Sequence, residues 1–541
     1  MKRCVAFLFC LQQLAAQNMP VSLRSDVTVQ FVTSVDAAAA RVAKDPITKD
    51  LFYITTSGNV NCIKDPFNSP YQVAVYTAAD HGIDFLQGMT FQDSVLFLVG
   101  NHRIDSTQYI GLVKRATLQP NGTRVWSTLL HTEAYAQSWT WYDHGFSGCT
   151  VSPDGAYLFI SSGSRTDHGE EQNNYGLYPG MREVSLTSAV FRIPINSQNL
   201  YLPNDSAQLA PYLYADGTRN SFDLAFDPSG NLFGTENSGD RDDPDELNWL
   251  RQGRNYGFPW KFGNDDNPQQ FPNYDPSTDV LLNGQCNCSK KGYYYNDPNF
   301  PSCAGYTFTQ PVNNLGPDAD KYRLASGHVQ DGSTCGSHIR SFTPHRCPLG
   351  LSFDRLNLLA SGLQGDGFMV SFTRGGDSTG LDQYGYPGTI CDPGQDLLHL
   401  QLSIDGSGEY QMQATTIVNN FNYPVDTYLD SNILYVIEYA YSGNGRLFAV
   451  TLPRSTLSVT DHVREKDPLI YPIPTNGIIQ VVLPDGVEQA QVQLTNIYGA
   501  QITCKRCYQH DSLDLIDLPP GVYIMEISSS EKKWLQKIIK Q

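Results

Sequence analysis

The sequence of 541 residues lacks the features that define several large classes of protein. No run reaches 18 apolar residues, so no segment is long enough for a membrane-spanning helix. No heptad or Gly-X-Y period runs through the chain, which excludes a coiled coil and a collagen-like fibre. Charged residues make up only 17%, and the net charge is −18. An acidic chain of this kind does not offer a broad face for phosphates, so we expect no nucleic-acid partner.

Aromatic and turn-forming residues are plentiful instead. Aromatic residues account for 11% of the chain, and there are 45 Gly and 32 Pro. A disordered chain would be poor in aromatics, so this composition indicates a large folded protein rich in turns. Helical periodicity is scarce between residues 20 and 455, which favours a mostly β structure.

Residues 1–16 have the pattern of a secretory signal peptide. Lys2 and Arg3 precede a short apolar stretch, and Ala15 and Ala16 precede an expected cleavage near Gln17. Cys4 and Cys10 would leave with this segment, so ten of the twelve cysteines remain. An even number of cysteines in an exported chain predicts disulfides.

The Cys504-Lys-Arg-Cys507 spacing is compatible with a local disulfide or with free thiols. A zinc site would need a second pair of ligands, and His510 alone does not supply one.

A short phrase recurs along the chain: a turn signal, then an apolar and aromatic strand, then a Gly or Ser turn. The six copies lie at residues 45–58, 91–101, 152–163, 227–239, 362–375 and 429–440. One such unit cannot bury both of its faces, so the units must stack around a ring. We therefore predict an all-β fold in which residues 17–455 form a six-bladed β-propeller. A Cys-rich insertion at about 262–345 interrupts it. A string of β-sandwiches or a solenoid is the alternative.

The last part of the chain has a different pattern. Residues 456–470 resemble a linker, and residues 471–541 alternate apolar and polar side chains with a period of two. Strands of this length predict a small C-terminal β-sandwich.

Three places could carry chemistry. Asp143 and His144 precede the third copy of the phrase, and a His at the centre of a propeller can act as a general base. Arg219 precedes the fourth copy and could stabilise a developing negative charge. Six carboxylates lie between residues 236 and 246, and so dense a group must be solvated or bound to a hard cation such as Ca²⁺. Each of these has an ordinary structural alternative: a loop His, a surface Arg or a solvated acidic loop.

At these residues the chain resembles the soluble pyrroloquinoline-quinone (PQQ) sugar dehydrogenases, the glucose/sorbosone dehydrogenase family. The matching phrases are DHGFSGCTVSPDGAYLFISSG, GTRNSFDLAFDPSGNLFGTEN, DELNWLRQGRNYGFPW and PLGLSFDRLNLLASGLQGDGFMVSFTRGG. They occur in the family's order, and the similarity covers roughly residues 40–455. The family has six blades, in agreement with the repeat count.

The resemblance implies roles for individual residues. His144 would be the catalytic base, with Asp143 beside it, and Arg219 would stabilise charge on quinone and substrate oxygens. The implied PQQ contacts are Asn220, Asn237, Asp245 and Arg374, and Asp84 and Gln87 are candidates for an early contact. The implied calcium ligands are Ser238 and Gly239 for an activating ion, and Glu246 and Tyr256 for a structural ion.

The C-terminal segment resembles the sorting domain of the type IX secretion system of Bacteroidetes. The matching pieces are YPIPTNG, NIYG, LDLIDLPPGVYIMEI and the final KIIKQ. This resemblance implies that the chain meets the type IX machinery and is secreted or held at the cell surface of a Bacteroidetes-type bacterium.

Together these features predict an exported oxidoreductase. It would oxidise an aldose at C1 to the lactone, with PQQ as hydride acceptor, Ca²⁺ as activator and an external electron acceptor. Two alternatives remain: a non-catalytic propeller that binds carbohydrate or protein, and a Ca²⁺-dependent propeller lactonase.

Overall fold

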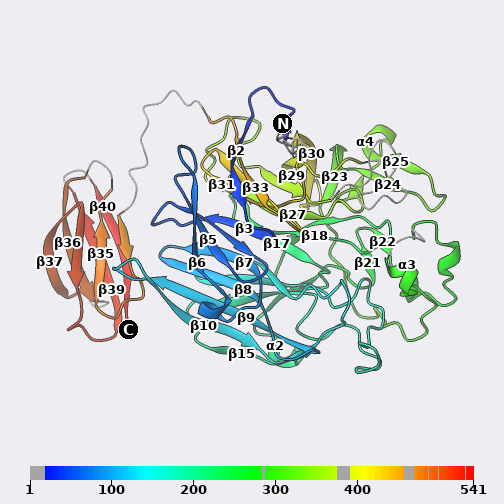
Figure 1. Ribbon diagram of the computed structural model, residues 1–541, viewed down its shortest axis with the longest axis horizontal. Coiled ribbons are helices and arrows are strands. Elements are labelled where there is room, and N and C mark those ends of the chain that lie inside the picture. The colour runs from blue at the N-terminus through cyan, green and yellow to red at the C-terminus, as the bar shows by residue number, and fades with distance from the viewer. Residues whose placement is uncertain are drawn as a thin grey trace, which may run out of the picture.

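The computed structural model describes residues 19–282, 287–373, 390, 392–455, 468–484, 487–496, 499–529 and 532–541. Strands are the main regular elements of this part of the chain, and its helices are few and short (Figure 1). Six sheets form a propeller, and two further sheets form the C-terminal unit. The predicted all-β fold is therefore confirmed. The predicted signal peptide lies outside the described residues.

The inner strands of the first three blades follow one another along the chain, but blades 2 and 3 each take an edge strand from a later segment. Blade 1 has β3 (Ala39–Lys44), β4 (Leu51–Thr55), β5 (Val60–Lys64) and β6 (Tyr71–Tyr76). Blade 2 has β7 (Phe85–Gln92), β8 (Val95–Arg103), β9 (Gln108–Leu118), β10 (Arg124–Thr132), β11 (Tyr135–Ala136) and β15 (Leu200–Leu202). Blade 3 has β12 (Phe146–Val151), β13 (Tyr157–Ser162), β14 (Ala189–Pro194), β16 (Leu213–Asp216) and β20 (Arg254–Asn255).

Blade 4 has three consecutive strands, whereas blades 5 and 6 include strands from distant segments. Blade 4 has β17 (Ser221–Phe226), β18 (Leu232–Glu236) and β19 (Glu246–Leu250). Blade 5 has β27 (Pro348–Phe353), β28 (Gly367–Ser371), β29 (Leu397–Ile404), β30 (Tyr410–Asn419), β23 (Asn313–Pro317), β26 (Ile339–Arg340) and β1 (Val21–Ser22). Blade 6 has β31 (Pro424–Asp430), β32 (Ile433–Glu438), β33 (Gly445–Thr451) and β2 (Thr28–Val35).

The repeated phrase marks the same strand in every blade. Its six copies contain β4, β8, β13, β18, β28 and β32, which are the second strands from the axis. The inner strands contact one another in a closed ring: β3, β7, β12, β17, β27, β31 and again β3. A strand from near the start of the chain also completes the last blade, because β2 pairs with β33 of blade 6.

Apolar side chains fill each wedge between neighbouring blades. The Phe97 cluster, for example, joins β8 of blade 2 to β13 of blade 3, and five similar clusters lie between the other pairs of blades. Each sheet therefore buries both of its faces only when a neighbouring blade packs on either side, which requires all six blades.

A buried ion cluster occupies the axis. Arg41 of β3 pairs with Asp426 of β31 at 3.2 Å and with Asp223 of β17 at 3.4 Å. Its Nε also donates to the carbonyl of Gln87 on β7. One guanidinium therefore joins four blades. Its charge is buried, and the two carboxylates supply the opposite charges that a buried cation needs.

The segment between blades 4 and 5 adds small elements. These are β21 (Lys261–Phe262), β22 (Asp265–Asp266), β24 (Lys321–Arg323), β25 (Val329–Asp331), α3 (Asn287–Lys291), α4 (Gly332–Cys335) and the 3₁₀ turns Pro268–Gln270 and Pro276–Thr278. Two short helices lie elsewhere: α1 (Ala78–His81) and α2 (Ser206–Leu209). None of the helices described is long and apolar enough to span a membrane.

The C-terminal unit has two sheets around one apolar core (Figure 1). One sheet contains β34 (Leu469–Tyr471), β35 (Ile478–Val482) and β38 (His510–Asp514), and the other contains β36 (Gln489–Asn496), β37 (Gln501–Tyr508), β39 (Gly521–Ser528) and β40 (Lys533–Lys540). The predicted small β-sandwich is confirmed.

The cysteines do not form the expected disulfides where they can be seen. Cys62, Cys149, Cys303, Cys335, Cys347, Cys504 and Cys507 are free thiols. Cys504 is exposed and Cys507 is buried, because residues three apart on β37 point to opposite faces. For this pair the free-thiol alternative is the correct one. Cys286, Cys391 and the side chain of Cys288 lie outside the described residues.

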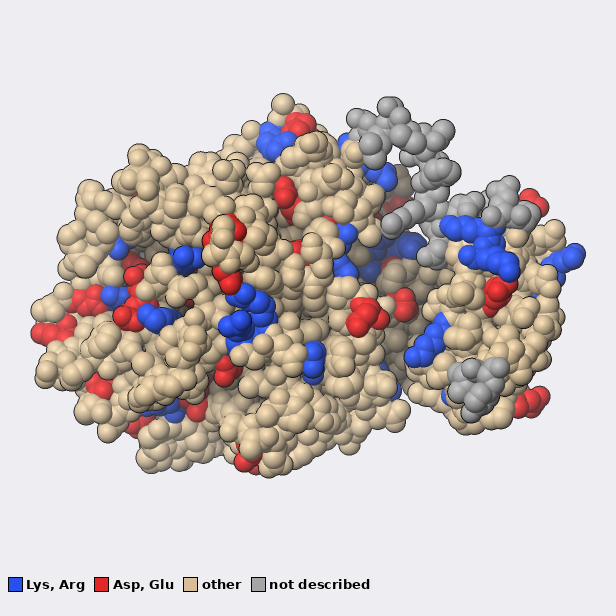
Figure 2. Space-filling view, turned by 180° about the vertical axis from the view of Figure 1, so that it is seen from behind, with Lys and Arg blue, Asp and Glu red and all other residues tan. Residues whose placement is uncertain are grey.

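Charged side chains are sparse on the surface, as the composition implies. On the face shown in Figure 2, acidic and basic side chains are interspersed among large uncharged areas.

Candidate active site

His144 lies just before β12, the inner strand of blade 3. Its backbone N–H donates to the carbonyl of Ser164 at 3.1 Å, and its ring Nδ1 lies 3.2 Å from the same oxygen. A carbonyl can only accept, so this contact places the ring proton on Nδ1 and leaves Nε2 as a proton acceptor. Burial, followed by the positive charge of Arg219, lowers the pKa of His144 to about 3. The imidazole is therefore neutral near pH 7.

Gly163 and Ser164 bring the predicted residues of blades 3 and 4 together. The N–H of Ser164 donates to the carbonyl of Arg219 at 2.6 Å. A Cβ at Gly163 would lie 2.4 Å from Cβ of His144 and 3.1 Å from Oδ1 of Asn220. Only glycine permits this close approach, so the turn after β13 places His144, Arg219 and Asn220 around one point.

His144 lines a pocket of about 80 Å³. The other lining residues are Phe85, Gln87, Asn101, Tyr109, Tyr135, Asp143, Gly145, Ser164, Arg165 and Thr187. Gln87 belongs to β7, and its amide nitrogen, when turned toward the neighbouring carbonyls, donates to that of His144 at 3.1 Å. Gln87 thus helps to fix the backbone of His144.

Asp143 does not meet the ring of His144. Its two carboxylate oxygens accept from the backbone N–H groups of Ser138 and Trp139, each at 2.8 Å. Burial raises the pKa of this carboxyl. In this structure Asp143 shapes the loop that precedes His144.

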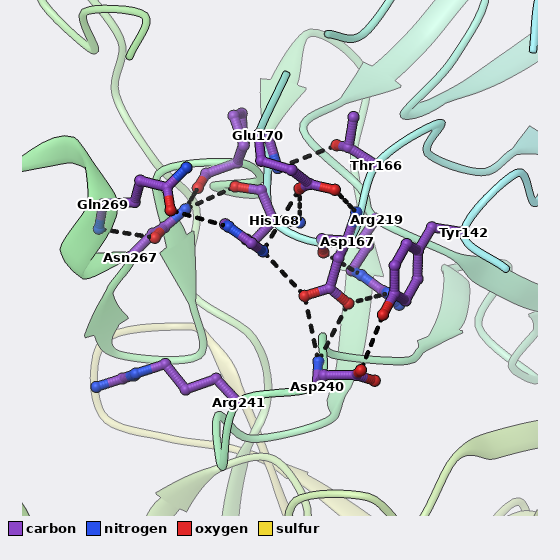
Figure 3. Close-up of polar contacts among 12 residues, drawn as sticks. Tyr142, Thr166, Asp167, His168, Glu170, Arg219, Asp240, Arg241, Asn267 and Gln269 are labelled. Carbon is purple, nitrogen blue, oxygen red and sulfur yellow. Dashed lines mark hydrogen bonds and ion pairs between the residues drawn. The ribbon is translucent and has the colours of Figure 1, made fainter. Parts of the chain in front are cut away.

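Arg219 is 4% exposed and is held by Asp167 (Figure 3). Its Nε donates to the carbonyl of Asp167 at 2.7 Å, its Nη2 lies 3.1 Å from Oδ1 of Asp167, and its Nη1 donates to the carbonyl of Asn237 at 3.1 Å. Three of the five N–H groups of this guanidinium are thereby used. Asp167 has no exposed surface, and burial together with the charge of Asp240 raises its pKa.

Asp167 also connects this arginine to the insertion (Figure 3). Its carboxylate pairs with Nδ1 of His168 at 2.9 Å, and Nε2 of His168 lies 3.2 Å from Oε1 of Gln269. The ring of His168 stacks on Tyr294 with centroids 3.6 Å apart. Two residues of the segment 262–345, Gln269 and Tyr294, therefore hold His168, which in turn contacts Asp167.

Asn237, whose carbonyl accepts from Arg219, is followed by Ser238, which contacts Asp245. The N–H and hydroxyl of Ser238 donate to Oδ1 of Asp245 at 2.7 and 2.9 Å. Oδ2 of Asp245 accepts from the N–H of Cys347 at 2.9 Å. Oδ1 of Asn237 is buried and has no partner among the described atoms. A Cβ at Gly239 would lie 3.0 Å from the carboxylate of Asp167.

Glu246 faces a second buried carboxylate. It lies directly opposite Glu236 across β18 and β19, and both side chains are under 5% exposed. The amide of Asn248 donates to both, at 2.8 Å to Glu246 and 3.3 Å to Glu236. Burial raises the pKa of Glu236 to about 7, and burial together with the charge of Glu236 raises that of Glu246 well above its usual value.

The predicted ligand Tyr256 is not brought into this arrangement. The hydroxyl of Tyr256 donates to the carbonyl of Trp249, and in the described structure no contact joins it to Glu246. Arg374 lies outside the described residues. Within the described ranges no group of three or more His, Cys, Asp or Glu residues is arranged to hold a metal ion.

Two family models match the chain. Residues 67–280 match Glucose / Sorbosone dehydrogenase, and residues 469–541 match the Secretion system C-terminal sorting domain. Both resemblances inferred from the sequence are thereby confirmed. The chain carries a domain of the sugar-oxidoreductase type and a sorting domain that directs it through type IX secretion to the cell surface or beyond. No curated protein matches the sequence.

Several solved structures are similar to this chain at low sequence identity. The soluble aldose sugar dehydrogenase of Escherichia coli, in its apo-form, is 15% identical with a TM-score of 0.45, covering 79% of this chain and 99% of that chain. The PQQ domain of pyranose dehydrogenase from Coprinopsis cinerea, in its holo form, is 12% identical with a TM-score of 0.47, covering 80% and 97%. The PQQ-bound aldose sugar dehydrogenase of Streptomyces coelicolor is 14% identical with a TM-score of 0.42, covering 80% and 99%.

Proposed function

We propose that this protein oxidises an aldose at C1 to the lactone, with PQQ as hydride acceptor and Ca²⁺ as activator. The observation that carries the proposal is that a neutral His144 and a buried Arg219 both contact the Gly163–Ser164 turn and so lie close together. His144 lies on the wall of a pocket and has an acceptor nitrogen at Nε2, as a general base requires.

The residues of this chain would divide the work. Nε2 of His144 would accept the proton of the C1 hydroxyl as that carbon is oxidised. Arg219 supplies positive charge beside the reacting oxygens, and its three bonds to Asp167 and Asn237 fix its position before substrate arrives. When bound, PQQ supplies the two-electron acceptor.

The donor set fits a polyanionic quinone. PQQ carries three carboxylates, and guanidinium groups bind carboxylates well. Arg219 keeps two N–H groups beyond its three described bonds, and the amides of Asn220 and Asn237 adjoin it. Asp245, which holds Ser238, and Arg374 are the further contacts that we propose.

The oxygen atoms also fit a hard cation. The buried Oδ1 of Asn237 lacks a partner among the described atoms, and the proposed ligands Ser238 and Gly239 follow it directly. Glu246 and Glu236 form a buried pair of carboxyl groups with raised pKa values, and a second cation would stabilise their charged forms. We propose Glu246 as a ligand of that structural ion and Tyr256 as a second ligand.

The Glu236–Glu246 pair predicts a pH-dependent effect of calcium on stability. The folded pKa of Glu236 is about 7, above its ordinary 4.5, so metal-free protein holds this proton more tightly when folded. Stability from this group is full below pH 4.5 and is lost as pH rises through about 7. We therefore expect Ca²⁺ to raise the Tm at pH 7.5 more than at pH 5. At 100 times the Kd the gain is about 2.7 kcal/mol.

Matched variants test this prediction. Glu246→Gln should abolish the calcium-induced rise in Tm and should weaken the fall in stability toward pH 7.5 without calcium. Glu488→Gln, on an exposed residue of the C-terminal unit, should behave like the wild type. An unchanged response to calcium in Glu246→Gln would place the ion elsewhere.

The function is tested by reconstitution. The full chain is incubated with PQQ and Ca²⁺, and aldoses are offered with an artificial dye as electron acceptor. We expect dye reduction that requires sugar, PQQ and calcium together. Failure of PQQ to bind in an absorbance titration would overturn the proposal, and hydrolysis of lactones with metal alone would favour a lactonase.

A further inference from the structure

Two exposed tryptophans lie on the loop that leads to His144. Trp139 is 47% exposed and Trp141 is 85% exposed. Indole rings are large apolar surfaces, and leaving them in water gives up the free energy of their burial. We call these two residues the Trp ledge.

The ledge is held in place by the residue next to His144. The carboxylate of Asp143 accepts from the backbone N–H of Trp139 at 2.8 Å and from that of Ser138 at 2.8 Å. Trp139 has a φ of 63°, in the left-handed region that is costly for a bulky side chain. The surrounding bonds thus impose a strained backbone on an exposed ring, a combination that is common at ligand-binding positions.

An aromatic surface leads from the ledge to the His144 pocket. The guanidinium carbon of Arg103 lies 5.9 Å from the ring centre of Trp139, 5.1 Å from that of Phe85 and 5.7 Å from that of Tyr109. Phe85 and Tyr109 line the pocket. Trp141 lies two residues from Trp139, so their Cα atoms are at most about 7 Å apart. Through Arg103, Trp139 of the ledge therefore adjoins two residues that line the pocket, and Trp141 lies close to it along the loop.

The pocket itself is small. Its volume is about 80 Å³, whereas sites for drug-sized ligands span about 300–1,000 Å³. A substrate with several sugar rings and its terminal ring near His144 would place the next ring beside Phe85 and Tyr109, which line the same pocket. The apolar C–H face of a pyranose packs well on an indole, which offers area at little cost in conformational entropy.

We propose that Trp139 and Trp141 form a subsite for the second and third rings of an oligosaccharide whose reducing end is oxidised at His144. This inference rests on the proposed function and names its substrate class: aldose-terminated oligosaccharides in preference to monosaccharides. Sugar rings stack on the ledge, and Arg103 offers hydrogen bonds to hydroxyl groups between the ledge and the pocket.

The kinetic test compares glucose with a glucose disaccharide and trisaccharide in the reconstituted full chain. We expect a higher kcat/KM for the longer sugars. Trp141→Ala, at an exposed position where folding is not at risk, and Trp139→Ala/Trp141→Ala should lower kcat/KM for the trisaccharide about tenfold or more. For glucose both should stay within about twofold of the wild type. Tyr508→Ala, an exposed aromatic on the C-terminal unit, is the control.

A binding test separates this inference from the dehydrogenase proposal. A trisaccharide reduced to its alditol cannot be oxidised at C1, and its binding is followed by tryptophan fluorescence. We expect saturable quenching in the wild type that is lost in Trp139→Ala/Trp141→Ala. Quenching without sugar turnover would remove the proposed function and keep the subsite. Glucose turnover without quenching, or equal losses for all sugars in the variants, would overturn the subsite.

Discussion

His144→Ala should lower kcat about 10²–10⁴-fold, the range expected when a positioned general base is removed. The ring has no carboxylate partner in the described structure; its Nδ1 faces the carbonyl of Ser164 at 3.2 Å. That contact fixes the tautomer with Nε2 as acceptor, so alanine removes the group that receives the proton. The reconstituted variant should retain PQQ binding, because the proposed cofactor contacts belong to other residues.

The control for this variant is another histidine. His328 is exposed in the segment between blades 4 and 5, and His328→Ala should leave kcat unchanged. Circular dichroism and Tm show whether His144→Ala is folded. A folded His144→Ala variant with more than a tenth of wild-type kcat would contradict the role of His144 as base.

The fold could be predicted from the sequence because the propeller repeats one local pattern. Each copy of the phrase combines a turn with a strand rich in β-branched and aromatic residues, and each became the second strand of a blade. The pairing of β2 with β33 could not be predicted in this way, because nothing in either strand specifies so distant a partner. Ring closure is a property of the whole set of blades.

The candidate site was predictable only in part, because its residues come from several blades and their contacts depend on how the blades pack. His144, Arg219 and Asn220 lie in motifs, and the structure brings them together at Gly163 and Ser164. Tyr109 of β9 lines the pocket although no motif marks it, and Asn101, the last residue of the second copy of the repeated phrase, lines it from β8. Their place beside His144 depends on how blade 2 packs against blade 3, which no local pattern specifies.

Asp167 was missed because it lies in an irregular loop where neither a strand pattern nor a motif points to it. Its importance follows from its complete burial and from its pairing with Arg219, and both arise from tertiary structure. A carboxylate just after the third copy of the repeated phrase was the one signal that the sequence contained.

Arg219→Met should lower kcat about 10²–10³-fold, as expected for loss of one preorganised group that stabilises developing charge. The same change should destabilise the fold by about 3–5 kcal/mol, because it removes the guanidinium that pairs with the buried carboxylate of Asp167. Burial already raises the pKa of Asp167, and loss of the guanidinium raises it further. The measurements are kcat in the reconstituted enzyme and the free energy of unfolding in denaturant.

A second variant separates the two effects. Asp167→Asn added to Arg219→Met removes the buried charge while preserving shape, so most of the lost stability should return. The new side-chain amide can still bond to His168 and to the N–H of Asp240, which contact the native carboxylate at 2.9 and 3.1 Å. The loss of kcat should remain, because neither substitution restores a cation beside the reacting oxygens. If kcat recovered together with stability, Arg219 would serve the fold alone, and the catalytic charge would have to come from another residue.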